Sequence, residues 1–188
     1  MQNVGVIASG NTTAISSENY VSRGAVTQSE GKVFIEADNV SINTIALKDY
    51  ERTKENHGYD LYKTTEKLGS EVTGLDNVII NAKDIDIKGS TVASDGLVQM
   101  TAQNISILNE VESIKKETKQ TDNGFMSSYE MEEKSYQEYA AASTVIGNNI
   151  ILDAGNDINV RASNIIAVKD GLENTGGNIS MIAGNNVN

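Results

Sequence analysis

The sequence has no cysteine, no proline and no tryptophan, and it has one histidine among its 188 residues. Without cysteine the chain can form neither the disulfide framework of a small secreted domain nor a thiolate metal site. His57 has no second histidine or cysteine with which to share a zinc ion, and it would be an unsupported base for any nucleophile. EF-hand spacings and glycine-rich phosphate loops are missing too. We therefore expect no catalytic residue, no metal and no cofactor.

Basic residues are also scarce. Fifteen Lys and Arg stand against 26 Asp and Glu, which gives a net charge of −11 and a sequence pI near 4.5. Nucleic-acid-binding proteins present clustered Lys and Arg, and no such cluster is visible along this sequence. The apolar runs are too short to span a membrane. We expect no nucleic-acid partner.

One short phrase recurs with variation. VFIEADNVSI at 33–42 returns as VIINAKDIDI at 78–87, as VQMTAQNISI at 98–107 and, with one extra residue, as IILDAGNDINV at 150–160. A truncated copy occupies 179–187. Such self-similarity is typical of a solenoid, in which each unit must stack on its neighbours to bury its apolar face. The sequence thus favours a scaffold over a catalyst.

The repeat period identifies the kind of solenoid. Val40 follows Tyr20 by 20 positions, and Ile105 follows Ile85 by the same interval. Apolar residues alternate within each copy and polar residues interrupt them, which indicates short strands joined at corners. We predict an all-β parallel β-helix of about 20 residues per coil and roughly six coils, forming a single domain over residues 1–188.

The N-terminus does not resemble that of a precursor for export. Residues 1–5 lack the charged region and apolar core of a secretory signal peptide. That indicates either a cytoplasmic protein or a piece of a longer one, and the truncated last repeat favours a fragment of a longer array.

Two insertions interrupt the period, at 48–74 and 109–145, and we expect both to protrude from the coil. Asn123-Gly124 predicts a β-hairpin turn in the second insertion, although its later half also fits helical spacing. The aromatic side chains there either contact a partner or pack back onto the coil. The candidate contact residues are seven of the nine aromatics: Tyr50, Tyr59, Tyr62, Phe125, Tyr129, Tyr136 and Tyr139.

Four aspartates raise an alternative function. Asp84, Asp86, Asp153 and Asp157 are the obvious carboxylates for a polysaccharide-active β-helix enzyme. However, Asp84 and Asp157 fall in the repeat column that also holds Asn39 and Asn104, where a short polar side chain suits a corner. We therefore interpret these acids as structural and expect no enzyme.

The phrases at 154–165 (AGNDINVRASNI) and 84–92 (DIDIKGSTV) resemble the haemagglutinin repeats of filamentous haemagglutinin and of contact-dependent growth inhibition exoproteins. The resemblance implies a right-handed β-helical filament, exported by two-partner secretion through an outer-membrane transporter and carried on the bacterial surface. Long charged insertions resemble the second repeat class of the inhibition exoproteins, which is associated with toxin delivery. Leu68-Gly69-Ser70 and Val145-Ile146-Gly147 are the expected points at which the insertions rejoin the coil.

The function expected from this reasoning is structural and adhesive. The chain would be a stalk segment of a secreted surface exoprotein that presents adhesin or toxin regions. Its expected partners are a target-cell surface protein or glycan and, during export, the transporter. Unpaired strand edges at the ends of the stack also predict end-to-end self-association.

Overall fold

The computed structural model describes residues 2–3, 5–55, 57–123, 128–169 and 177–188. Within these ranges all regular structure is β, and no helix is present that could cross a membrane. The chain divides into two compact units. The coil unit comprises Met1–Ile45, Leu68–Glu110 and Ala142–Asn188, and the sheet unit comprises Ala46–Lys67 and Val111–Ala141.

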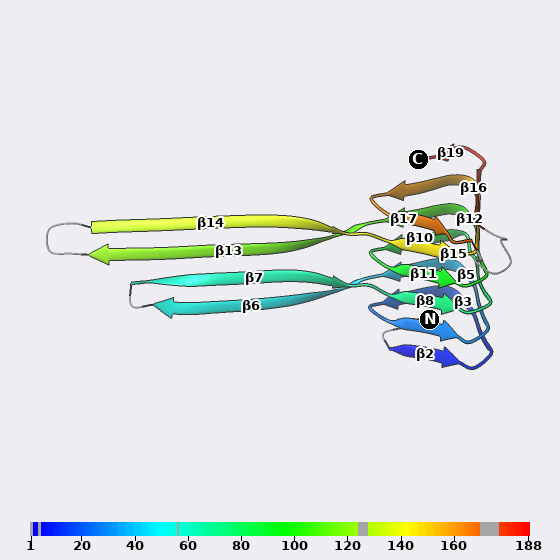
Figure 1. Cartoon of the computed structure of the whole chain (residues 1–188), viewed down its shortest axis with the longest axis horizontal. Helices are drawn as coiled ribbons and strands as arrows, with labels where there is room; N and C mark the ends of the chain where they lie inside the picture. Colours follow the sequence, from blue (N-terminus) through cyan, green and yellow to red (C-terminus); the bar gives the residue numbers. More distant parts are fainter. Residues whose placement is uncertain (1, 4, 56, 124–127, 170–176) are drawn as a thin grey trace. The chain divides into compact units, whose positions relative to one another are not determined.

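The coil unit consists of parallel strands in two sheets (Figure 1). The nine-stranded sheet contains β1 (Gln2–Asn3), β3 (Thr12–Arg23), β5 (Lys32–Asn43), β9 (Asn77–Asn81), β10 (Asp84–Lys88), β12 (Leu97–Leu108), β16 (Asn149–Arg161), β18 (Asn178–Ala183) and β19 (Asn186–Val187). The six-stranded sheet contains β2 (Val6–Ser9), β4 (Val26–Ser29), β8 (Glu71–Gly74), β11 (Thr91–Ser94), β15 (Thr144–Gly147) and β17 (Asn164–Ala167). This parallel stacking confirms the predicted β-helix.

Strand register confirms the repeat period. Val40 pairs with Tyr20 on one side and with Ile85 on the other, and Ile85 pairs with Ile105. The extra residue of the fourth copy is absorbed as a register shift between β12 and β16, where Ala102 pairs with Ala154 but Asn104 pairs with Asp157. Each repeat inferred from the sequence therefore corresponds to one coil of the β-helix.

The core lies between the sheets and is built from the alternating apolar positions. Most strands of the coil bury alternate residues within each straight stretch, as in β5, where Val33 and Ile35 and then Val40 and Ile42 are buried. The described residues of β2, β17, β18 and β19 include no buried one. Tyr20 occupies the same column as Val40 and is fully buried. Its hydroxyl lies 2.7 Å from Thr27 Oγ1, which satisfies a polar atom inside the coil.

One corner of the coil carries both insertions. Where no insertion occurs, Gly24, Gly89 or Ala162 turns this corner with a positive φ between 45° and 55°. The insertions occupy the same place in the connections from β5 to β8 and from β12 to β15. A ladder of serine side chains follows this corner, and each hydroxyl oxygen accepts a hydrogen bond from a backbone N–H of the adjacent coil. The serines are Ser70, Ser90, Ser143 and Ser163.

The ends of the insertions differ from the sequence-based bounds of 48–74 and 109–145. β8 (Glu71–Gly74) and β15 pair with β11 inside the coil, so the inserted segments end at Lys67 and Ala141. The second insertion rejoins the coil at Ala142-Ser143, not at Val145-Ile146-Gly147. In this coil Ala142 stands where other coils have the corner glycine, so the Gly-Ser pair that marks the corner in the sequence is absent. The next glycine along the sequence, Gly147, lies at the end of β15 and not at the corner.

The two insertions together form one four-stranded sheet (Figure 1). Its order is β14 (Ser128–Ala141), β13 (Glu110–Asn123), β7 (Gly58–Leu68) and β6 (Ile45–Glu55), and β13 pairs antiparallel with β7. The second insertion is therefore a hairpin, and its later half is a strand rather than a helix. The turn itself, at Gly124, lies outside the described residues.

Candidate functional site

Six of the seven candidate aromatic residues lie on the sheet unit. Tyr50, Tyr129, Tyr136 and Tyr139 are 50–61% exposed, and Tyr59 and Tyr62 are half-buried. Phe125 lies outside the described residues. The structure thus brings together on one sheet tyrosines that are as far apart in sequence as Tyr50 and Tyr139, but it divides them between the two faces.

Register and contacts assign the side chains to the faces. Residues opposite each other in an antiparallel pair share a face, so Tyr59 and Lys119 lie on one side and Tyr62 and Lys116 on the other. The Arg52 guanidinium over the Tyr59 ring joins β6 to the first side, and the ion pair between Lys119 and Glu130 joins β14 to it.

Strand alternation then separates the charges of the sheet. The basic face carries eight cations: Lys48, Arg52, Lys54, Lys63, Lys67, Lys115, Lys119 and Lys134. Against these stand four carboxylates, those of Glu117, Glu130, Glu132 and Glu138, which leaves a net charge of +4.

The opposite, acidic face has the inverse balance. It carries six carboxylates and one cation, a net charge of −5, counted over residues whose side chains the structure describes: Asp49, Glu51, Asp60, Glu66, Glu112, Glu133 and Lys116. Lys116 lies over the Tyr62 ring, 5.7 Å from its centroid. The sheet is therefore electrostatically two-sided.

A network of contacts crosses all four strands on the basic face. Arg52 Cζ lies 4.5 Å from the centroid of the Tyr59 ring, and the Tyr59 hydroxyl donates to Glu117 Oε1 at 2.6 Å. Glu117 also pairs with Lys115 at 3.1 Å, and Lys119 pairs with Glu130 at 2.6 Å. These contacts link side chains of neighbouring strands across the basic face.

The network shifts the ionisation of its members. The hydrogen bond from Tyr59 lowers the pKa of Glu117, with help from Lys115, and the same bond raises the pKa of Tyr59. Hydrogen bonding and ion pairing with Glu130 raise the pKa of Lys119, and the hydrogen bond to Glu132 raises the pKa of Lys134. Both lysines are thus held in their charged form.

No basic cluster is visible along the linear sequence, but the folded sheet gathers one on its basic face. Basic residues that are scattered along two distant segments gather on one face because four strands alternate in phase. The signal is present in the spacing Lys48-x-Tyr50-x-Arg52-x-Lys54 and in the acids Asp49 and Glu51 between them. Summed along the sequence, these alternating charges nearly cancel, so the net charge of the segment does not reveal the two charged faces.

The aspartates of the enzyme alternative lie on the coil unit, where two of them belong to a polar ladder. Asn19, Asn39, Asp84, Asn104, Asp157 and Asn186 pair in register along one corner. Side-chain bonds join neighbours, from Asn39 to Asn19 at 2.9 Å and from Asn104 to Asp84 at 2.7 Å. Asp84 and Asp157 therefore occupy the structural column that the sequence predicted.

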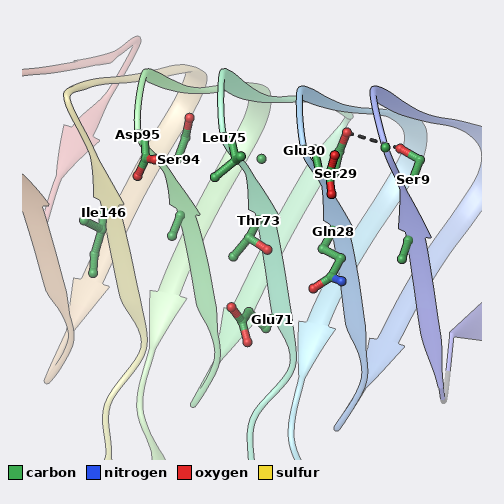
Figure 2. Close-up of a pocket in the computed structure, with 14 residues that line it drawn as sticks. Ser9, Gln28, Ser29, Glu30, Glu71, Thr73, Leu75, Ser94, Asp95 and Ile146 are labelled. Atoms are coloured by element: carbon green, nitrogen blue, oxygen red, sulfur yellow. Dashed lines mark hydrogen bonds between the residues drawn. The ribbon is translucent and has the colours of Figure 1, made fainter.

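The coil unit also has a groove of about 640 Å³ on the outer face of its six-stranded sheet (Figure 2). Small and polar side chains such as Ser9, Thr73 and Ser94 line it, together with the carboxylates of Glu30, Glu71 and Asp95. No Lys, Arg or His is among the fourteen lining residues. Asp84, Asp86, Asp153 and Asp157 belong to strands of the other sheet, so the candidate acids and the groove are separate.

No metal site accompanies these acids in the part of the chain that the structure describes. No group of three or more His, Asp or Glu side chains is placed there to hold an ion.

Comparison with known proteins supports the coil assignment. Residues 124–188 match the family model described as Hemagglutinin repeat, a stretch that includes β14 to β19. No curated protein and no solved structure gives a significant match. The match includes the phrase at 154–165, and with the stacked parallel coils it indicates a filament segment of a secreted, surface-associated exoprotein of the adhesin type. Residues 124–188 are thus haemagglutinin repeat of the filamentous haemagglutinin type.

Proposed function

We propose that the chain is a non-catalytic segment of an adhesive bacterial surface filament, in which the coil unit is the shaft and the sheet unit contacts the target cell. The composition of the sheet unit carries this proposal. It holds six described tyrosines and nine of the fifteen basic residues of the chain, and none of its described residues is buried. A surface of exposed rings and fixed charges suits recognition better than it suits a structural core.

A target-cell protein or glycan is the partner that this surface fits. Tyrosine offers a large apolar ring with a polar tip, which suits the faces and hydroxyl groups of sugars as well as protein hot spots. Tyr50 and Tyr136 combine more than half exposure with a neighbouring charge, because Lys63 lies 5.1 Å from the Tyr50 centroid and Glu138 accepts the Tyr136 hydroxyl at 2.6 Å.

A role in toxin delivery is the finer form of this proposal. The two insertions are long and charged, which is the feature that resembles the toxin-delivery repeat class. They also interrupt the same corner of the coil and combine into one sheet. In this proposal the filament is displayed at the outer membrane after export by a two-partner-secretion transporter.

End-to-end association of coils belongs to the same proposal. The coil that contains β17 and β18 exposes apolar side chains, with Ile166 and Ile179 both 44% exposed and Ile182 57% exposed. Strand edges with apolar residues favour pairing with a further coil. Such association would extend the shaft without involving the sheet unit.

Binding of the purified chain to outer-membrane vesicles tests the contact role. The comparison variant lacks 46–67 and 111–141, with each gap closed by the short Gly-Ser corner that Gly89-Ser90 makes in an uninserted coil. We expect the full chain to bind and the shortened variant to keep its β-sheet circular dichroism but to lose at least tenfold in affinity. Equal binding by two folded proteins, or no binding by either, would contradict the proposal.

A further inference from the structure

The sheet unit lacks the feature that normally stabilises a β-sheet. A sheet of three or more strands needs an apolar face or a packed partner to be stable in water. None of the described residues in Ala46–Lys67 and Val111–Ala141 is buried, and both faces are mainly polar. Each face of this sheet is therefore a surface that a partner could cover.

The two faces of the sheet are complementary to each other. The basic face has a net charge of +4 and the acidic face a net charge of −5, and both carry exposed tyrosines. Tyr50 and Tyr136 lie on the basic face, and Tyr129 and Tyr139 on the acidic face. From this complementarity we propose that sheet units of separate copies of this chain stack face to face, the basic face of one copy on the acidic face of the next.

This arrangement follows from the sign of the charges. Stacking basic on basic or acidic on acidic faces would bring like charges together, which is costly at an interface. Stacked sheets lie about 10 Å apart, a spacing that tyrosine and lysine side chains can fill from both sides. The contact uses two different surfaces of the chain, so it is heterologous, and each added copy presents another free face. That free face at the end of a stack is the one left for the target-cell contact proposed above.

A polyanion is the rival occupant of the basic face. An anionic glycan or nucleic acid would satisfy its cations but would leave the acidic face uncovered. A second copy covers both faces with one interaction, and its charges are already part of the molecule. The observations therefore favour the second copy.

Salt dependence of self-association in the unmodified chain is the first test. The Debye length, beyond which exposed charges are largely screened from each other, is about 3 Å at 1 M salt and about 30 Å at 0.01 M salt. Sedimentation velocity should show an association constant that falls at least tenfold over that range. End-to-end pairing of coils relies on backbone hydrogen bonds and apolar contacts, so it would persist in salt. Association that is unchanged or strengthened by salt would overturn the proposal.

A charge-swap experiment identifies the surfaces. One variant, Lys48→Glu/Lys54→Glu/Lys63→Glu, turns the basic face net negative, and a second, Asp49→Lys/Glu51→Lys/Glu66→Lys, turns the acidic face net positive. Each alone should lose the salt-sensitive association, and an equimolar mixture should regain it. The control Lys32→Glu/Lys83→Glu/Lys169→Glu changes the same amount of charge on the coil unit and should associate as the unmodified chain does.

Two results would overturn the inference. One is a mixture of the two variants that fails to associate although both retain β-sheet circular dichroism. The other is binding of heparin, used as a polyanion probe, by the unmodified chain with loss of binding in the first variant, while the unmodified chain stays monomeric at low salt. That second result would assign the basic face to a polyanion instead of a second copy.

Discussion

Asn104 Nδ2 donates a 2.7 Å hydrogen bond to Asp84 Oδ1, the side chain directly beside it in the neighbouring coil. The same column joins Asn186 to Asp157 at 3.0 Å. Along this corner the amides of Asn104 and Asn186 thus each donate a hydrogen bond to the carboxylate of the aspartate in the adjacent coil. Two of the four acids that suggested catalysis, Asp84 and Asp157, are thus parts of a stacking ladder.

This pairing predicts a difference between two substitutions of Asp84. Asp84→Asn keeps an oxygen acceptor for Asn104, so stability should change by less than about 0.5 kcal/mol. Asp84→Ala removes the acceptor and should cost about 1 kcal/mol. Urea unfolding measures both. Asp153→Ala, an exposed acid on the same sheet, is the control and should be nearly neutral. Equal effects of Asp84→Asn and Asp84→Ala would show that the side-chain bond contributes nothing.

The buried hydroxyl of Tyr20 gives a second prediction. Its 2.7 Å bond with Thr27 Oγ1 lies within the core, where a lost hydrogen bond is costly. Tyr20→Phe should lower the free energy of unfolding by about 1 kcal/mol, and Tyr20→Ala should lower it by about 3–5 kcal/mol because it also opens a cavity.

A double-mutant cycle with Thr27→Val isolates the bond between the two hydroxyls. The coupling energy should be about 1 kcal/mol. If the effects of Tyr20→Phe and Thr27→Val simply add, the hydroxyl pair is not an energetic contact and the prediction is wrong.

Ala162 has a φ of 45°, in the left-handed region that Gly24 and Gly89 occupy at the equivalent corners. A non-glycine residue there is strained by about 1 kcal/mol, although glycine also costs unfolded-state entropy. Ala162→Gly should therefore raise stability by about 0.5 kcal/mol. Gly89→Ala should lower it by more than about 1 kcal/mol, because its Cβ would meet Thr44 Cγ2 at 2.6 Å. Thermal unfolding checks both: the melting temperature should rise for Ala162→Gly and fall for Gly89→Ala.

The coil is predictable from the sequence because its information is local and repeated. Val40, Ile85 and Ile105 carry the period in the sequence itself, and Ala162 aligns with the corner residues Gly24 and Gly89 by the repeat spacing alone. The bounds of the insertions are harder to predict, since Ala142 replaces the glycine that marks other corners.

The sheet unit is only partly predictable. A hairpin follows from Asn123-Gly124, but the pairing of Lys63 with Lys115 depends on two segments more than 40 residues apart finding one register. No local pattern specifies that register. The two-sided charge distribution is a property of all four strands together, and it depends on how their faces align.

The bond between Tyr59 and Glu117 gives the last prediction, which concerns pH. The pKa of Glu117 in the folded chain lies below its ordinary value of 4.5, mainly because Tyr59 donates to it. The resulting stabilisation is complete above the unfolded-state pKa and is lost as the pH falls through the folded-state pKa. The pKa of Tyr59 lies above 10.0, so its contribution is present below that pH and is lost as the pH rises through the raised value. Tyr59→Phe should therefore raise the pKa of Glu117, as measured by NMR of the side-chain carboxyl carbon. Tyr62→Phe, on the acidic face, should leave that pKa unchanged, and a Glu117 pKa that does not respond to Tyr59→Phe would remove this bond from the network of the basic face.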